Sequence, residues 1–261
     1  MNYLIAIDDT DMPGTKGTGW LAQEMGQEMI ANGMGAISPI SRHQLFVHED
    51  VPFTSHNSSM CFEFSCTCGE MDRVTAFMIK YLESRSIPGS DPGLCILPLA
   101  GEDEPGSRSG LKPEFDPSPL IRFGCRAKKE VLTKDQAYGL AQDLGIHLTE
   151  HGGTGQGVVG ALAGIGLRLS GNDGRYRGWY HLGQPGDVVP VDRLCQYDFI
   201  DALVTPQGEA LPLESRVSIG SAKTKTVRLD SRQVEVVVEN EASRTSGIAF
   251  RTITKQEAKA Y

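Results

Sequence analysis

The first hundred positions of the chain repeat apolar residues in two different periods, which predict strands and helices. The unbroken apolar run "YLIAI" at 3–7 predicts a buried strand. Leu21, Met25 and Met29 recur every four positions, which is the spacing of one helix face, so a helix is predicted at 19–33. The same reasoning predicts strands at 35–47, 58–67 and 93–99 and a second helix at 70–85. The order β-α-β-β-α-β predicts an α+β fold with ferredoxin-like elements.

A third helix is predicted from Thr133 to about Leu144. Thr133 and Gln136 have the spacing of a capping box, in which each side chain bonds the backbone of the other. Gly145 directly follows and is well suited to end the helix.

The composition changes twice after residue 100, and these changes predict the domain organisation. Residues 101–120 are rich in Pro, Gly and charge, which indicates an exposed loop that serves as a tether or a lid. From about residue 185, short β-type segments alternate with turns. We therefore predict one region at 1–185 and a small β-rich region at 186–261.

Charge and cysteine content narrow the class of protein. The chain has 261 residues and a formal net charge of −8, which argues against a generally basic nucleic-acid binder but leaves room for a local basic patch. Its six cysteines mostly lie inside apolar runs, as buried free thiols do, which indicates a reducing compartment. The start "MNYLIAIDD" reaches acid too early for a signal peptide, and no apolar run approaches the roughly 20 residues of a membrane helix. We expect a cytoplasmic protein without a membrane partner.

Three carboxylates follow the first predicted strand, at Asp8, Asp9 and Asp11. Crowded like charges are unfavourable unless a cation or a proton compensates them. Mg²⁺ prefers oxygen ligands and keeps substrate phosphates as partners, so the cluster is a candidate metal site. Alternation along a strand points Asp8 and Asp9 to opposite sides, so not all three need be ligands. The alternative is a simple turn, for which Asp is a common residue.

The loop after this cluster suits an anion. Gly14 and Gly17 let backbone N–H groups approach a phosphate closely, and Lys16 adds a positive charge. A helix begins directly after the loop, and helix N-termini attract anions. Thr18 lies at the helix entrance, where it is either an N-cap or a contact to phosphate or metal, or an acceptor hydroxyl.

A second glycine-rich stretch, "HGGTGQGVVGALAGIG" at 151–166, has two interpretations. Its small residues allow close helix packing, or its loop forms a second anion site at a helix N-terminus through Gly153, Gly155 and Gly157. Two such stretches in one chain, one of them beside a carboxylate cluster, predict a nucleotide site.

These segments together resemble a known family. "IDDTD" followed by a Gly-containing loop to Thr18 is similar to the opening of the archaeal tRNA-isoleucine agmatinylcytidine synthetases, TiaS. "SDPGLCIL" and "GTGQGVVGALAGIGLRL" resemble that family's NPG strand and its glycine-rich helix. The resemblance spans roughly 3–180, and no counterpart of the family's OB-fold and zinc-ribbon modules is visible after residue 185.

The resemblance implies a kinase-like module joined to a ferredoxin-like domain, which binds ATP and Mg²⁺. It carries over Asp8, Asp9, Asp11 and Thr18 as catalytic positions, with the three aspartates on the metal and Thr18 as a phosphate acceptor. The implied activity is that of an ATP- and Mg²⁺-dependent phosphotransferase or ligase that activates a carbonyl or hydroxyl for amine attack. Its expected partners are a nucleotide and either a small-molecule amine or tRNA; the sequence leaves homo-oligomerisation open.

Two other functions remain open at the level of the sequence. The chain could bind a nucleotide for regulation without turning it over. It could also be an RNA-binding module with "SAKTKTVRLDSR" at 221–232 as its basic surface, in which Lys223, Lys225 and Arg228 would meet phosphates.

Overall fold

A computed structural model of the chain describes residues 1–49, 57–66, 71–100, 111–112, 114–240 and 247–259. It is a mixed α/β structure in which most strand pairs are antiparallel. The chain divides into two compact units, Met1–Ser170 and Gly171–Tyr261, which we call the N-terminal and the C-terminal unit. In the described part of the chain, no helix is long and apolar enough to cross a membrane.

The N-terminal unit begins with the predicted succession of elements: β1 (Asn2–Asp8), α1 (Thr18–Ala31), β2 (Gly35–Ile37), β3 (Ser41–Gln44), β4 (Ser58–Cys66), α2 (Met71–Arg85) and β5 (Gly93–Pro98). It continues with α3 (Ser118–Ala127), α4 (Lys134–Asp143), β6 (His147–Glu150) and α5 (Gly157–Leu169). The strand expected at 35–47 is two strands, interrupted around Pro39, which has no N–H to donate to a ladder. Most of the loop expected at 101–120 lies outside the described residues, and its last three residues already belong to α3.

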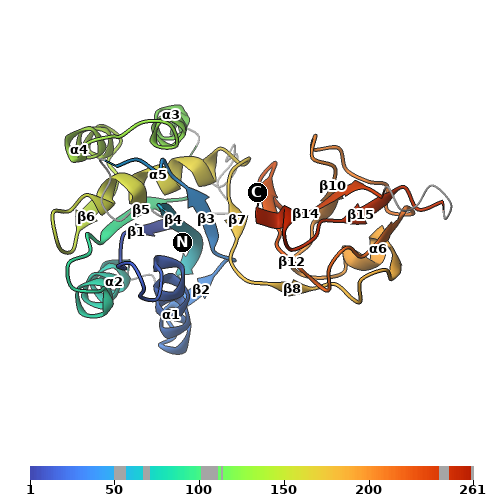
Figure 1. The fold of residues 1–261 in the computed structure, drawn as a ribbon. Coiled ribbons are helices and arrows are strands. Elements are labelled where there is room, and N and C mark those ends of the chain that lie inside the picture. Colours follow the sequence, from blue (N-terminus) through green and yellow to red (C-terminus); the bar gives the residue numbers. More distant parts are fainter. Residues whose placement is uncertain (50–56, 67–70, 101–110, 113, 241–246, 260–261) are drawn as a thin grey trace. The chain divides into compact units, whose positions relative to one another are not determined.

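The sheet of this unit has the strand order β6-β5-β1-β4-β3, and every neighbouring pair is antiparallel. Helices cover both of its faces, α1 and α2 on one side and α5 on the other, with α3 and α4 packed beyond α5 (Figure 1). A strand that is covered on both faces is apolar at every position, which explains the unbroken run at the start of the chain.

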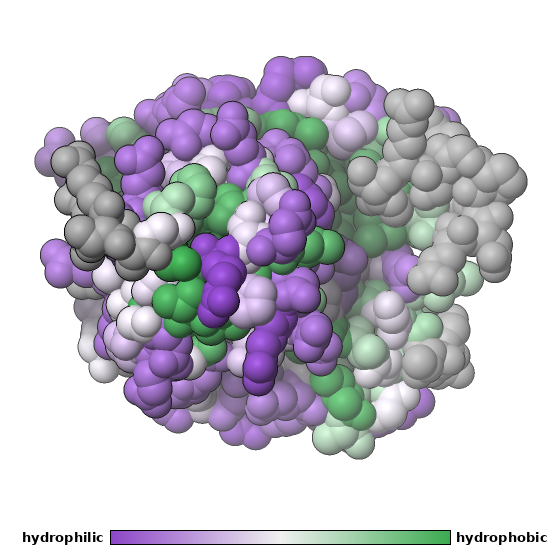
Figure 2. Space-filling model, turned by 90° about the vertical axis from the view of Figure 1, so that its right-hand side faces the viewer, coloured by the Kyte–Doolittle hydropathy of each residue, from purple (hydrophilic) through white to green (hydrophobic). Residues whose placement is uncertain are grey.

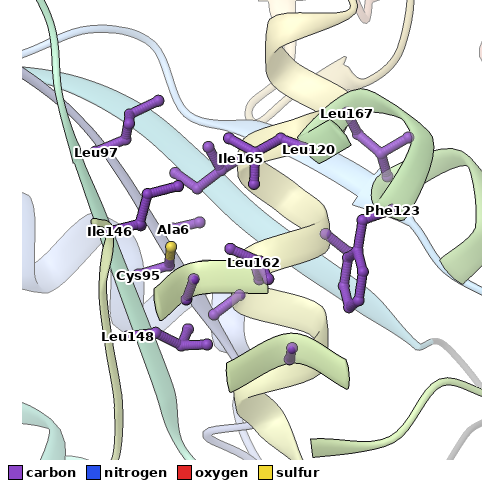
Figure 3. Close-up of a cluster of buried hydrophobic side chains, with 14 of the residues drawn as sticks. Ala6, Cys95, Leu97, Leu120, Phe123, Ile146, Leu148, Leu162, Ile165 and Leu167 are labelled. Carbon is purple, nitrogen blue, oxygen red and sulfur yellow. The ribbon is translucent and has the colours of Figure 1, made fainter. Parts of the chain in front are cut away.

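Side chains of β1 alternate between two hydrophobic cores. Tyr3, Ile5 and Ile7 pack with α1 and α2, whereas Leu4 and Ala6 face α5. Figure 3 shows the second core, in which side chains of the sheet lie opposite residues of α5 and two residues of α3 close the cluster: Ala6, Cys95, Leu97, Ile146, Leu148, Leu162, Ile165, Leu167, Leu120 and Phe123.

Helix α5 packs closely because it presents glycines to its neighbours. A Cβ at Gly164 would overlap with the side chain of Ser59 on β4, and a Cβ at Gly166 would overlap with the carbonyl oxygen of Leu120 on α3. The close-packing interpretation of this glycine-rich segment is therefore confirmed for the helix itself.

The capping box predicted for α4 is also present. Thr133 accepts from the N–H of Gln136, whose side chain accepts from the N–H of Thr133. The helix begins at the position that the local sequence predicts.

The C-terminal unit consists mainly of short strands: β7 (Arg175–Tyr176), β8 (Tyr180–His181), β9 (Val188–Pro190), β10 (Ala202–Val204), β11 (Arg216–Ser218), β12 (Lys223–Thr224), β13 (Val227–Leu229), β14 (Arg232–Glu239) and β15 (Phe250–Thr252). A short helix α6 (Val191–Leu194) and a 3-10 turn at Glu257–Lys259 complete it. The unit starts earlier than the boundary expected near residue 185, because β7 pairs with β13 and β8 pairs with β12.

Candidate functional site

The carboxylate cluster lies where β1 ends and the chain turns toward α1. Asp8 is the last residue of β1 and only 6% exposed. Asp9 follows in the left-handed backbone region, with φ of 52°. A non-glycine residue there costs on the order of 1 kcal/mol, and such strain is concentrated at functional sites. This turn takes the backbone out of the sheet immediately before Thr10 and Asp11.

A compact hydrogen-bonded group joins this turn to the start of α1. The Oδ1 atom of Asp11 accepts from the backbone N–H of Thr18 at 2.8 Å and from its hydroxyl at 2.6 Å. The backbone N–H and the hydroxyl of Thr10 both donate to Oγ1 of Thr18, each at 3.2 Å. Thr18 is 5% exposed. The side chain of Thr18 therefore has its proton directed at a carboxylate and its oxygen held by two donors.

This geometry corrects one of the roles considered for Thr18. Gly17 is the N-cap of α1, and Thr18 is the first helical residue. The capping interaction comes from Asp11, seven residues upstream, which accepts the N–H of Thr18. The N-cap interpretation of Thr18 is wrong, because its hydroxyl is a donor to Asp11 and not an acceptor for the helix.

The structure adds Asp91, a residue to which the sequence assigned no role. It lies between α2 and β5 and is 8% exposed. Its carboxylate accepts from the backbone N–H of Thr154, from the Thr154 hydroxyl at 2.7 Å and from the N–H of Gly155 at 3.3 Å. Its carbonyl oxygen accepts from the N–H of Gly157 at 3.1 Å. The sequence could have pointed to Asp91, because this aspartate stands directly before Pro-Gly at the start of a buried strand.

Asp91 brings the second glycine loop to the carboxylate cluster. The backbone N–H of Asp91 donates to the carboxylate of Asp9, while its own carboxylate holds the loop that precedes α5. On the same helix, a Cβ at Gly160 would overlap with Oδ2 of Asp8, so only glycine fits there. The turn at Asp8 and Asp9 is thus linked to the loop through Asp91 and lies directly against Gly160 of α5, although more than 140 residues separate Asp8 from the loop in sequence.

In the second glycine loop, the residues predicted to contact phosphate lie against Asp91. The N–H groups of Gly155 and Gly157 donate to Asp91, so a phosphate would have to replace Asp91 as their acceptor. Gly153 has φ of 55° and lies against Asp91.

In the first glycine loop, the three residues predicted to contact phosphate have three different surroundings. Gly14 has φ of 84° with open space around it. Gly17 lies next to Asp11, and the Nζ atom of Lys16 lies 3.6 Å from the ring centroid of Trp20. The lysine would have to leave this ring to meet a phosphate.

Burial and mutual repulsion raise the pKa of two of these carboxyls. For Asp8 the pKa lies well above its ordinary value, mainly because the side chain is buried and then because of the charges of Asp9 and Asp11. For Asp9 burial, followed by the charges of Asp91 and Asp11, raises the pKa to about 6. Such raised values indicate a site that gains stability from a proton or a cation.

No three His, Cys, Asp or Glu side chains in the described ranges are arranged to share a metal ion. Protein sites for Mg²⁺ commonly supply only one or two carboxylates, with water and substrate phosphate oxygens completing the octahedron. Asp8, which is buried, and Asp9, which is partly buried beside it, both have raised pKa values and fit that smaller ligand set.

Replacing Asp8 by Asn is expected to raise the free energy of unfolding at pH 7 by about 1 kcal/mol. A carboxyl whose pKa is raised on folding binds its proton more tightly in the folded than in the unfolded state, so stability falls as pH rises from the unfolded pKa to the folded pKa. Asn has no proton to lose and avoids this cost. Urea denaturation at pH 4 and pH 7 measures it: the gain should be larger at pH 7, and an equal difference at both pH values would contradict the burial argument.

Comparison with known proteins matches this chain to part of a longer curated protein. No protein-family model matches the chain. A curated relative, the isoleucine-tRNA 2-agmatinylcytidine synthetase TiaS of Pyrococcus horikoshii, is 26% identical over 171 residues, which is 64% of this chain and 36% of that protein. The chain resembles part of TiaS. The resemblance inferred from the sequence motifs is confirmed.

Two further matches cover a similar share of this chain. The crystal structure of a complex of TiaS with its tRNA and ATP superimposes with a TM-score of 0.51 at 21% identity, over 64% of this chain and 36% of that one, so the fold is similar. An uncharacterized protein of Methanocaldococcus jannaschii is 28% identical over 165 residues, 63% of this chain and 49% of that protein. The chain thus spans between 36% and 49% of the length of these curated relatives.

Proposed function

We propose that this chain is an ATP-dependent, RNA-modifying enzyme of the ligase or phosphotransferase type. The observation that carries the proposal is the group Asp11–Thr18–Thr10, at the edge of a carboxylate cluster, in the part of the chain that resembles TiaS. TiaS is named as a synthetase acting on an isoleucine tRNA, and its structure is known with tRNA and ATP. By analogy, the second substrate is tRNA or a small-molecule amine. The attacking group would be an amine, and it would react with the carbonyl or hydroxyl that ATP has activated.

Thr18 is proposed as the phosphoryl acceptor. Its hydroxyl proton already points at Asp11, which would take it as general base when the oxygen forms a bond to the γ-phosphorus of ATP and ADP leaves. The two donors on Thr10 stabilise the negative charge that develops on Oγ1. The phosphoryl group could then pass to a carbonyl or hydroxyl of the substrate, where an amine displaces it.

Asp8 and Asp9 are the proposed holders of Mg²⁺. Asp8 is buried and Asp9 is partly buried beside it, which together with their mutual repulsion makes both costly as anions, and a divalent cation removes that cost. When bound, the ion would neutralise phosphate charge in the transferring group. Phosphate contacts remain proposed for four residues of the two glycine loops: Gly14, Lys16, Gly17 and Gly153.

The strand order of the N-terminal unit also supports the proposal. A β-α-β-β-α-β chain whose sheet runs β5-β1-β4-β3 has the order of a ferredoxin-like fold. We therefore propose that β1 to β5 with α1 and α2 form the ferredoxin-like part, and that α3, α4, β6 and α5 supply the kinase-like elements. The buried free thiol of Cys95 is in keeping with action in the cytoplasm.

Calorimetry of ATP binding with and without Mg²⁺ tests the proposal. The wild type should bind ATP tightly only with Mg²⁺, and Asp8→Asn and Asp9→Asn should each weaken that binding by about tenfold or more. Asp143→Asn, at the exposed end of α4, is the matched control and should bind as the wild type does. Absence of ATP binding in all conditions would refute a nucleotide site. Binding without turnover on any RNA would instead favour a regulatory nucleotide-binding protein.

A further inference from the structure

The C-terminal unit carries an aromatic and cationic surface on the ribbon formed by β8 and β12. In this ribbon Tyr180 pairs with Thr224 and His181 pairs with Lys223. Thr224 is fully buried, whereas His181 and Lys223 are exposed, so the two sides of the ribbon differ as alternation requires. One position before Tyr180, on the same outward side as His181, lies Trp179, which is 40% exposed.

Two lysines from different segments gather at this tryptophan. The Nζ atoms of Lys225 and Lys255 lie 4.6 Å and 5.2 Å from the centroid of the Trp179 ring, within the range of a cation–π interaction. Lys225 also donates to the carbonyl oxygen of Gly178 at 2.8 Å, and the backbone N–H of Lys255 donates to the Ser221 hydroxyl at 3.1 Å. Positive charge is therefore concentrated around one exposed indole.

The inward side of the ribbon holds this surface in place. The Thr224 hydroxyl donates to the buried carboxyl of Glu235 on β14 at 2.8 Å. The ring of Tyr180 stacks on Phe199 with a centroid distance of 4.4 Å, and Phe199 stacks on Tyr197 at 4.9 Å. Trp179 is thus presented from a supported ribbon.

We propose that this surface, which we call the Trp179 face (Trp179, His181, Lys223, Lys225 and Lys255), binds a single-stranded segment of RNA. A base can stack on the indole, because every base has a π-face, and the lysines can then turn to the adjacent phosphates. The identity of the RNA as the substrate rests on the proposed function. The new element is that the C-terminal unit, which begins at Gly171, supplies the contact.

The lysines at Trp179 attract a polyanion locally, and the unit that carries them is not acidic overall. The chain as a whole has a net charge of −8, but Lys and Arg equal Asp and Glu in number over 171–261, so the excess acid belongs to the N-terminal unit. Figure 2 shows one face of the molecule, on which hydrophobic residues lie among hydrophilic ones; no single residue is marked in that view. The exposure of Trp179 is instead given by its side chain, which is among the exposed large apolar side chains of the C-terminal unit. An acidic peptide would use the lysines but would gain little from the indole, so RNA fits the pair of features better.

The Trp179 face overlaps only in part with the basic surface expected at 221–232. Lys223 and Lys225 belong to the Trp179 face, but the guanidinium of Arg228 donates to the Tyr176 hydroxyl and to the carbonyl oxygen of Ser231, both at 3.1 Å. Lys255, which lies outside that segment in sequence, takes part instead.

Fluorescence anisotropy with a labelled single-stranded oligoribonucleotide, measured on the full chain without ATP, tests the inference. Trp179→Ala should weaken binding by about tenfold or more, and Trp179→Phe should retain most of the affinity. Replacing Lys223, Lys225 and Lys255 together by Ala should lower the slope of log affinity against log salt by about two, at roughly 0.7 per phosphate contact.

A matched control replaces Lys128 and Lys129, exposed after the end of α3, by Ala; it should leave binding unchanged. Unaltered affinity in Trp179→Ala, an equal loss in the α3 control, or competition by polyglutamate as effective as by unlabelled RNA would each overturn the inference. The outcome is independent of ATP calorimetry: ATP binding without Trp179-dependent RNA binding refutes only this inference, and the reverse result refutes only the proposed nucleotide site.

Discussion

Asp11→Asn and Thr18→Val should each lower phosphoryl transfer from ATP by about a thousandfold, the range expected when a general base or its nucleophile is removed. Asn cannot accept the proton that the Thr18 hydroxyl directs at Asp11 over 2.6 Å, and Val has no hydroxyl to be activated. Incubation with γ-labelled ATP measures the effect, with mass spectrometry to locate the phosphoryl group on Thr18.

Thr18→Ser separates chemistry from structure, because it keeps the oxygen between Asp11 and the two donors of Thr10. It should retain transfer to within about tenfold of the wild type. Asp143→Asn, on the exposed surface of α4, should have no effect. Label that appears at the wild-type rate on Thr18→Val protein would show that another residue is the acceptor.

Gly166→Ala should destabilise the N-terminal unit by about 3 kcal/mol, as overpacking of a close helix contact does. The new Cβ would occupy the position of the carbonyl oxygen of Leu120, and backbone atoms cannot move aside as a flexible side chain can. Because α3 and α5 make the most extensive helix–helix contact of the unit, the change also loosens the core shown in Figure 3. Urea denaturation followed by circular dichroism measures the loss.

Gly139→Ala is the matched control within the same unit. Gly139 lies in α4, is exposed and has nothing within 4 Å of a Cβ. Both substitutions remove the same backbone freedom from the unfolded chain, so Gly139→Ala alone should stabilise by about 0.5–1 kcal/mol. Equal stability of the two variants would mean that the contact between α3 and α5 relaxes without cost.

Much of the local structure follows from short-range patterns in the chain. The residues of β1, α1, α2 and β5 can be assigned from apolar period alone, because burial of one or both faces sets which positions must be apolar. The capping box of Thr133 and Gln136 is a contact over three residues and is equally readable. Helix α3 was missed, since the Pro-rich stretch before it reads as loop, although Leu120, Phe123 and Ala127 form its buried face.

The candidate site is readable only in part. The sequence alone singles out Asp8, Asp9, Asp11 and Thr18, because crowded carboxylates before a glycine loop are conspicuous in one short segment. It leaves open whether Thr18 caps the helix or carries a reactive hydroxyl, since that depends on which atom accepts its proton. The loop between Asp11 and Thr18 decides this, by folding so that one carboxylate oxygen receives both donors of Thr18.

Contacts between distant segments were decided by the tertiary structure. Asp91 bonds Thr154 across 63 positions, and Gly160 of α5 lies against Asp8 of β1. Lys255 reaches Trp179 from a different segment than Lys225 does. Periodicity records which face of an element is buried, but not which element covers it, because any apolar face of suitable size satisfies the same pattern. The amino-acid sequence alone therefore determined most elements of the N-terminal unit except α3, and the first half of the site, while packing of the sheet, α5 and the ribbon selected the partners that complete it.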